Sequence, residues 1–141
     1  MVVVEMGIEV HWDNPEQTIV MIVYTRPWTW KDFDAAIEQM VAMFNSVNHQ
    51  VDVVFNILDA GFPPADAMSH FKKAAEIKHV NGGMLIYVAP KVLTQFVNRI
   101  VRILTVAFAG SGTFETPKFI FTKSVEEARS YLLAHRTIKA S

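Results

Sequence analysis

The residues best placed for chemistry lie between Asp59 and His70, where an apolar segment ends in an aspartate and a loop leads into a helical pattern. Ligands of parallel α/β sheets collect where strands end and helices begin, so this loop is the first candidate site. Asp66 and His70 are four residues apart, which is the spacing of a base and its orienting acid on one helix face. No nucleophile within reach follows from the sequence, so a surface ion pair is the favoured interpretation. An enzyme that uses Asp59 and His70 as acid and base is the third hypothesis.

The same loop also has a structural interpretation. Asp59 followed by Gly61 is typical of a turn, in which the carboxylate accepts nearby backbone N–H groups. Asp66 is placed as a helix N-cap, and Pro63 and Pro64 stiffen the approach to it. A helix N-terminus also exposes unpaired N–H groups that hold an anion or a partner's carboxylate. The candidate loop or anion site comprises Asp59, Gly61, Asp66 and Ser69.

Other chemical motifs are weak. The chain has no cysteine, which excludes disulfides, thiolate zinc sites and a cysteine nucleophile. Its five histidines show neither H-x-x-x-H nor H-E-x-x-H spacing. Trp28 and Trp30 flank a helix start beside Arg26, where capping the core is favoured over lining a pocket. We therefore predict no catalytic residue, no cofactor site and no metal site.

The composition predicts a single domain over residues 1–141. Thirteen basic residues against fourteen acidic ones give a net charge of -1, and the scattered basic residues argue against a nucleic-acid surface. The longest apolar stretch is interrupted by Arg102 and Thr105, well short of the roughly 20 residues that a membrane span needs. The start of the chain lacks a basic segment and reaches Glu5 at once, so no signal peptide is predicted. Together with the absence of cysteine, this favours a cytoplasmic location.

The apolar patterns predict an α/β fold with the element order ββαβαβαβα. Alternating or continuous apolar runs predict strands, whereas apolar positions at helical spacing and capping residues such as Thr29 and Ser124 predict helices. The predicted strands cover residues 8–12, 18–24, 51–58, 84–89 and 118–122, and the four main helices begin near residues 30, 66, 90 and 125. Strands that alternate with helices pair in parallel through right-handed crossovers. We expect a mixed sheet of about five strands in which the first strand is antiparallel.

This element order, with "NILDAGFPPADAM" after the central strand, "GGMLIYVAP" before a helix and "FIFTKSVEEARSYL" near the end, resembles the SpoIIAA-like superfamily that includes STAS domains. The resemblance covers residues 8–134. It implies a sheet covered by four helices, no catalytic machinery, and a regulatory role through protein interactions. The same superfamily is similar in fold to lipid-carrying CRAL-TRIO domains.

The loop departs from the STAS phosphorylation motif. In that family, the motif consists of an aspartate, any residue and a serine, followed later by a second aspartate, two small hydroxyl residues and a glycine. Asp59 matches the first aspartate and Asp66 roughly matches the second, but Gly61 stands where the serine is expected. The two residues after Asp66 are alanine and methionine, and Ser69 lies one or two positions late. We therefore expect no phosphorylation switch in this loop.

The long helix predicted after Pro90 has more apolar surface than packing on one sheet requires. We expect it to form a homodimer, with a wedge between the sheet and a neighbouring helix as the alternative. The candidate interaction surface comprises Phe96, Arg99, Ile100, Arg102, Ile103 and Val106. The leading hypothesis is a non-enzymatic STAS-like module with a protein partner. The competing hypothesis is a binder of a small apolar or lipid-like ligand, for which Ile22, Tyr24, Val54 and Tyr87 are expected on a second face of the sheet.

Overall fold

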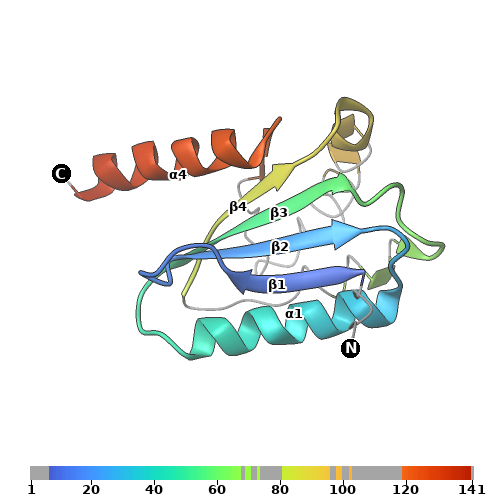
Figure 1. The fold of residues 1–141 in the computed structure, drawn as a ribbon, viewed down its shortest axis with the longest axis horizontal. Coiled ribbons are helices and arrows are strands. Elements are labelled where there is room, and N and C mark those ends of the chain that lie inside the picture. Colours follow the sequence, from blue (N-terminus) through green and yellow to red (C-terminus); the bar gives the residue numbers. More distant parts are fainter. Residues whose placement is uncertain are drawn as a thin grey trace, which may run out of the picture.

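The computed structural model describes residues 7–67, 69, 70, 73, 81–95, 98, 99, 102 and 119–140, with residues 119 and 136–140 described by their backbone alone. Figure 1 shows a twisted sheet with α1 and α4 on either side of it. The strands are β1 (Ile8–Trp12), β2 (Ile19–Thr25), β3 (Val51–Asp59), β4 (Gly82–Val88) and β5 (Phe119–Thr122), and the complete helices are α1 (Trp30–Asn45) and α4 (Val125–Ala140).

The sheet has the strand order β1-β2-β3-β4-β5, so each described strand lies beside its neighbours in the chain. β1 pairs with β2 in antiparallel orientation, with Val10 opposite Ile22. The other pairings are parallel, with Ile22 opposite Phe55 and Phe55 opposite Tyr87. The predicted mixed sheet with an antiparallel first strand is therefore confirmed.

Helix α1 begins where the sequence predicts. The Thr29 hydroxyl accepts a hydrogen bond from the Asp32 N–H at 3.1 Å, and the Asp32 carboxylate accepts one from the Thr29 N–H at 3.0 Å. This reciprocal capping satisfies two of the N–H groups that a helix start leaves unpaired. At the other end, the side-chain amide of Asn81 donates to the carbonyls of Phe44 and Val47 at 2.9 and 3.0 Å. Both ends of α1 are thus held by side chains.

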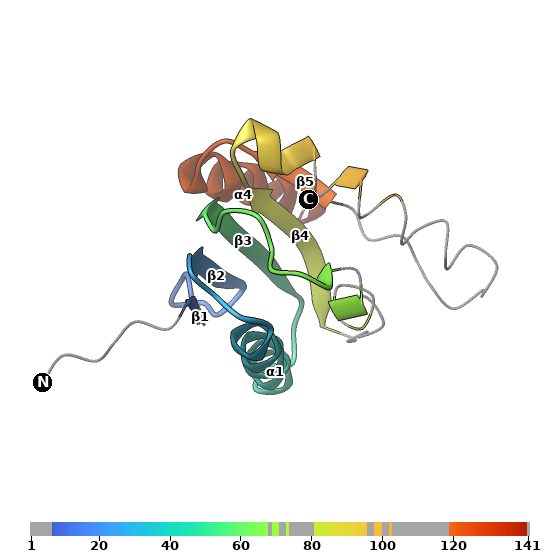
Figure 2. The same ribbon diagram turned by 90° about the vertical axis from the view of Figure 1, so that its right-hand side faces the viewer.

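Alternate residues of the strands point to opposite faces and form two separate cores. Figure 2 shows the two faces edge-on. The core on the α1 face contains Val20, Ile22, Tyr24, Val53, Phe55, Phe33, Met40 and Phe44, together with Leu93. The core on the α4 face contains Ile19, Met21, Val54, Ile86, Val88, Ala128 and Leu132. Ile22, Tyr24 and Tyr87 therefore share the α1 face, and grouping Val54 with them on one face was wrong.

Helix α4 is held in place by its cap and by one ion pair. The Ser124 hydroxyl accepts a hydrogen bond from the Glu127 N–H at 3.1 Å, as the capping pattern predicts. The Arg129 guanidinium donates to both carboxylate oxygens of Asp13 at 2.6 and 2.8 Å. This contact joins the last helix to the turn between the first two strands and raises the pKa of Arg129 through that hydrogen bond.

Two predicted helices are described in part. Residues 91–95, 98, 99 and 102 are helical, as are residues 67, 69, 70 and 73. Among the described residues, three segments are continuously helical, namely α1, α4 and residues 91–95. The sequence predicted four main helices. Arg99 and Arg102 are exposed, whereas Phe96, Ile100, Ile103 and Val106 of the candidate interaction surface lie outside the described residues. No helix in the described part is long and apolar enough to cross a membrane.

Candidate functional site

The candidate site lies at the edge of the sheet where the parallel strands end. Thr25, the last residue of β2, is paired with Asp59, the last residue of β3. The Arg26 N–H donates to the Asp59 carbonyl at 3.0 Å, which extends the contact into the two loops that follow. The loop after Asp59 is therefore attached to the segment that leads into α1.

Two tryptophans hold this loop along its length. The indole N–H of Trp28 donates to the Ala60 carbonyl at 3.1 Å, and that of Trp30 donates to the Ala65 carbonyl at 2.7 Å. Trp28 is buried and makes an edge-to-face contact with Trp30 at a centroid distance of 5.1 Å. The tryptophans thus cap the core, as predicted, and they also hold the loop, which the sequence does not reveal because each bond spans more than thirty residues.

Gly61 is required by the geometry of the loop. Its φ of 66° lies in the left-handed region that other residues rarely adopt, and a Cβ built on it would lie 3.2 Å from Cδ of Arg26. The structure therefore brings Asp59, Gly61 and Arg26 together. Asp59 and Arg26 are exposed, and no ion pair joins them among the described residues.

Asp66 and its neighbours differ from the predicted arrangement. Asp66 has a φ of 70°, whereas an N-cap residue normally has an extended backbone. Its carbonyl accepts a hydrogen bond from the Ser69 hydroxyl at 3.2 Å. His70 does not pair with Asp66 within the described residues, because its ring stacks on Trp30 at 4.2 Å with an angle of 3° between the planes. The predicted surface ion pair is therefore wrong, and an aromatic stack takes its place.

Large apolar side chains are exposed along this edge. Phe62 in the loop is 60% exposed, Leu58 near the end of β3 is 40% exposed, and Val92 in the first turn after β4 is 57% exposed. Leu133 on α4 is the other large apolar side chain exposed in the described part of the chain. In the sequence, Phe62 stands between Gly61 and a proline, in a loop rather than in an apolar run. We call Leu58, Phe62 and Val92 the carboxyl-edge patch.

A second apolar feature lies on the α1 face of the sheet. Phe55, Tyr87 and Phe121 stack across β3, β4 and β5 with centroid distances of 4.7 and 5.6 Å. Burial raises the pKa of Tyr24 and that of Tyr87, and the neighbouring Tyr87 raises that of Tyr24 further. The rings of Phe55, Tyr87 and Phe121 thus form a continuous stacked aromatic row across three neighbouring strands.

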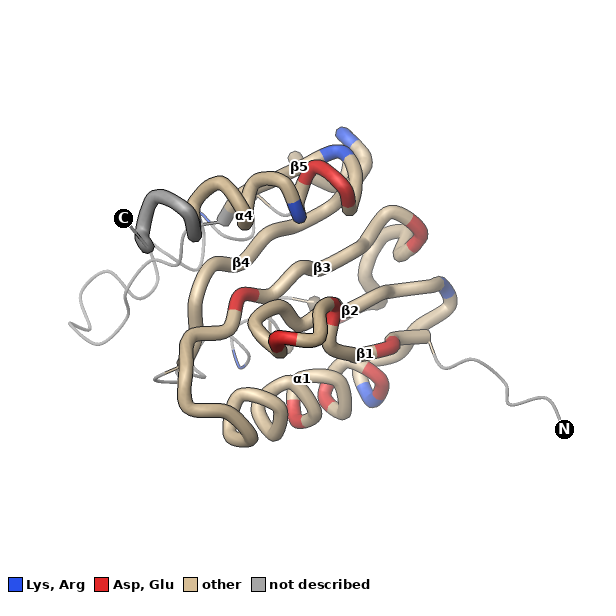
Figure 3. The backbone as a smooth tube through the Cα atoms, turned by 60° about the vertical axis from the view of Figure 1, so that its left-hand side comes forward, with Lys and Arg blue, Asp and Glu red and all other residues tan. Residues whose placement is uncertain are grey.

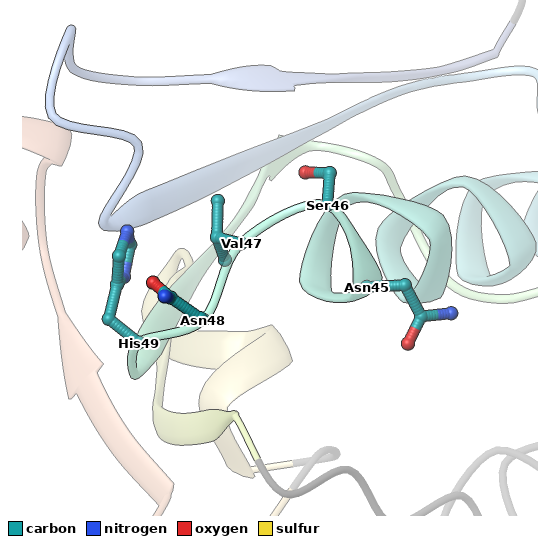
Figure 4. Close-up of a pocket in the computed structure, with 5 residues that line it drawn as sticks. All are labelled: Asn45, Ser46, Val47, Asn48 and His49. Atoms are coloured by element: carbon teal, nitrogen blue, oxygen red, sulfur yellow. The ribbon is translucent and has the colours of Figure 1, made fainter.

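A surface hollow of about 500 Å³ lies at the opposite end of α1 from the loops. Its lining residues are Asn45, Ser46, Val47, Asn48 and His49. Figure 4 shows these side chains spread along one turn of chain rather than directed at a common point. A binding site needs a few polar groups that converge on the ligand, so this hollow is a weaker candidate than the carboxyl-edge patch.

Among the residues that the structure describes, charged side chains do not form a cluster at the carboxyl-edge patch or at the hollow beside α1. Figure 3 shows acidic positions along α1 and near the β1–β2 turn, whereas the basic positions of the described chain are dispersed. No group of three or more histidine, aspartate or glutamate side chains suited to a metal ion occurs within the described ranges. Buried side-chain nitrogen and oxygen atoms in the same ranges all have hydrogen-bond partners.

Comparisons of this chain with family models, with curated proteins and with solved structures found no match. The arguments about function that follow therefore use the fold and the geometry of the edge.

Proposed function

We propose that this chain is a non-enzymatic, STAS-like interaction module whose protein partner binds the carboxyl-edge patch. The observation that carries the proposal is the exposure of Leu58 at the end of β3 and of Phe62 in the loop that follows, which Trp28 and Trp30 hold at both ends. A phenylalanine that becomes fully buried contributes roughly 1.5–3 kcal/mol, and aromatic anchors at the centre of an interface commonly dominate its energy. The tryptophan hydrogen bonds reduce the ordering cost of binding, because the loop is already fixed.

The strand order supports an interaction surface more than a small-molecule site. Ligands of open α/β sheets bind in a crevice where the strand order reverses. The five described strands run in sequence order without a reversal, so their topology provides no such crevice. The mixed sheet, with α1 and α4 on opposite faces, supports the STAS-like assignment.

The loop geometry supports the absence of a phosphorylation switch. The two residues after Asp66, where the STAS motif has its hydroxyl residues, are alanine and methionine. Gly61 stands at the earlier serine of that motif, where its left-handed backbone and the nearby Arg26 side chain disfavour any larger residue. Without such a switch, binding at this edge would be regulated by the concentration of the partner protein. The lack of cysteine supports a cytoplasmic setting for the module.

Site-specific photocrosslinking in cells tests the proposal. A benzophenone amino acid at position 62 is expected to form one discrete protein adduct. The matched control is the same amino acid at position 133, where Leu133 is 69% exposed but lies on α4, away from the patch. With the captured protein purified, Phe62→Ala should weaken its binding about tenfold, whereas Leu133→Ala should leave it unchanged. Equal adducts at both positions, or equal binding by both variants, would contradict the proposal.

A binder of a small apolar or lipid-like ligand is the second candidate, and the stacked row of Phe55, Tyr87 and Phe121 favours it. Native mass spectrometry of protein purified from cells separates the two candidates. A retained adduct of lipid mass supports the ligand binder, and its loss in a Tyr87→Ala variant that remains folded would locate the ligand on the aromatic row. Protein without any adduct supports the interaction module.

A further inference from the structure

The outer edge of β1 presents regularly spaced backbone groups. The Thr25 N–H donates to the Gly7 carbonyl at 2.7 Å, and the Asp13 N–H donates to the Ile19 carbonyl at 2.8 Å. Between two such hydrogen-bonded positions of an antiparallel pair, the backbone N–H and C=O groups of successive residues point alternately toward the partner strand and away from it. The backbone groups of Glu9 and His11 therefore face β2. Those that point away from the sheet belong to Ile8, Val10 and Trp12.

In the described part of the chain, this edge carries little of the usual protection. Natural edge strands carry lysine, proline or a bulge that prevents another strand from pairing. β1 has neither lysine nor proline, and its pairing with β2 runs through Ile8–Trp12 without a register shift. Figure 2 shows β1 at the margin of the sheet and α1 on the face beside it. Among the described residues, the cover on this edge is the Gln39 side chain, which donates to the Val10 carbonyl at 3.3 Å.

We propose that a second copy of this chain binds to β1, in antiparallel orientation and centred on Val10, to form one continuous sheet. With that register, Val10 exchanges backbone hydrogen bonds with Val10 of the second copy, and Ile8 does so with Trp12 of the second copy. The arrangement has two-fold symmetry, so both copies use the same surface and the assembly closes as a dimer. Strand addition of this kind obtains its affinity from main-chain hydrogen bonds and its specificity from the side chains.

The side chains of β1 are complementary to themselves in this register. Glu9 lies opposite His11 of the second copy, and the symmetry repeats the pair. Both residues are exposed and both point to the α4 face, away from the core residues Ile8 and Val10. Opposite-charge or hydrogen-bonding pairs directly across two strands stabilise them, whereas like charges at the same place are destabilising. An imidazole donates a hydrogen bond to a carboxylate whether it is neutral or charged.

Helix α1 leaves room for the second copy. Ala35 and Ala42 lie one turn before and after Gln39 on the same stripe of the helix, and all three are exposed. The small side chains of Ala35 and Ala42 permit the α1 helices of the two copies to approach where the sheets join. The Gln39 hydrogen bond is long for its type, and the Val10 N–H of the second copy replaces it.

Charge reversal across β1 tests the proposal by sedimentation equilibrium. The unaltered protein is expected to form a dimer at high-micromolar concentration. His11→Glu places two carboxylates opposite each other twice in the assembly, so it should weaken association about tenfold or more. The double variant Glu9→His/His11→Glu restores the complementary pair and should recover the dimer. His49→Glu, at an exposed histidine outside β1, is the matched control and should leave association unchanged.

Hydrogen exchange gives a second measurement that needs no variant. The Val10 N–H points away from β2, so its exchange should slow as the protein concentration rises. A protein that stays monomeric, a Val10 exchange rate independent of concentration, or a dimer that His11→Glu leaves intact would each overturn the proposal. The last result would place the interface on another surface, such as the helix that contains Arg99 and Arg102.

Discussion

At the scale of single residues, Gly83 shows how closely this chain is packed around a buried carboxylate. Asp52 is buried on β3, and its carboxylate accepts a hydrogen bond from the Met84 N–H at 2.8 Å. A Cβ built on Gly83 would clash with that carboxylate and would lie 2.7 Å from the side-chain nitrogen of Gln50. Gly83 therefore permits the contact between the amino ends of β3 and β4.

We expect Gly83→Ala to lower the free energy of unfolding by about 1–3 kcal/mol, because the added methyl group displaces the Asp52 carboxylate. Urea denaturation measures the change. In an Asp52→Ala background the same glycine substitution should be less destabilising, because its main obstacle has been removed. Equal losses in both backgrounds would show that Asp52 does not constrain this position.

Residue-level predictions from the sequence succeeded at the caps of α1 and α4, whereas Asp66 and His70, which are only four residues apart, do not form the predicted pair. The caps at Thr29 and Ser124 involve residues three positions apart, so the spacing itself predicts the contact. The stack of His70 on Trp30 and the ion pair of Asp13 with Arg129 join residues far apart. Such contacts depend on which elements the fold brings together, and no local pattern encodes them.

At the scale of elements, α4 packs on the sheet through Leu132, the larger of its two buried side chains in the described part of the chain. Leu132 is 1% exposed in the core on the α4 face, whereas the adjacent Leu133 is 69% exposed. Leu132→Ala should lower the free energy of unfolding by about 2–5 kcal/mol, because it leaves a cavity against the sheet. Leu133→Ala is the matched control and should change it by less than about 0.5 kcal/mol. Chemical denaturation compares the two, and similar effects would mean that α4 packs differently.

The positions of the helices and strands were predicted well from the sequence, but the sheet face on which Val54 lies was not. Strands β1 to β5, α1 and α4 all lie within a few residues of their predicted positions. Val54 was misplaced because β3 is apolar on both sides, and a strand buried on both faces shows no alternation that distinguishes them. The carboxyl-edge patch was missed for a related reason, since exposure depends on what the fold leaves uncovered.

At the scale of the whole molecule, the buried tyrosines predict how stability changes in alkali. Burial raises the pKa of Tyr24 above its ordinary value near 10, so the unfolded chain loses this proton at a lower pH than the folded chain. Stability is therefore complete below about pH 10 and falls as the pH rises further, by up to about 1.4 kcal/mol per pH unit for each such tyrosine. Tyr24→Phe should reduce this slope in urea denaturation measured at several pH values. An unchanged slope would mean that Tyr24 does not contribute to it.

The uninterrupted order of the strands also affects how the chain assembles during synthesis. Each described strand pairs with the strand made just before it, so the sheet can grow from β1 to β5 as the ribosome releases the chain. The part of the α1 face that belongs to β1 and β2 is covered early, because α1 packs on these two strands and is made before β3. The other face exposes Met21, Val54 and Ile86 until α4 has been made, since Ala128 and Leu132 supply its cover. A nascent chain that stops before α4 therefore carries an open apolar surface, which is the state most in need of a chaperone.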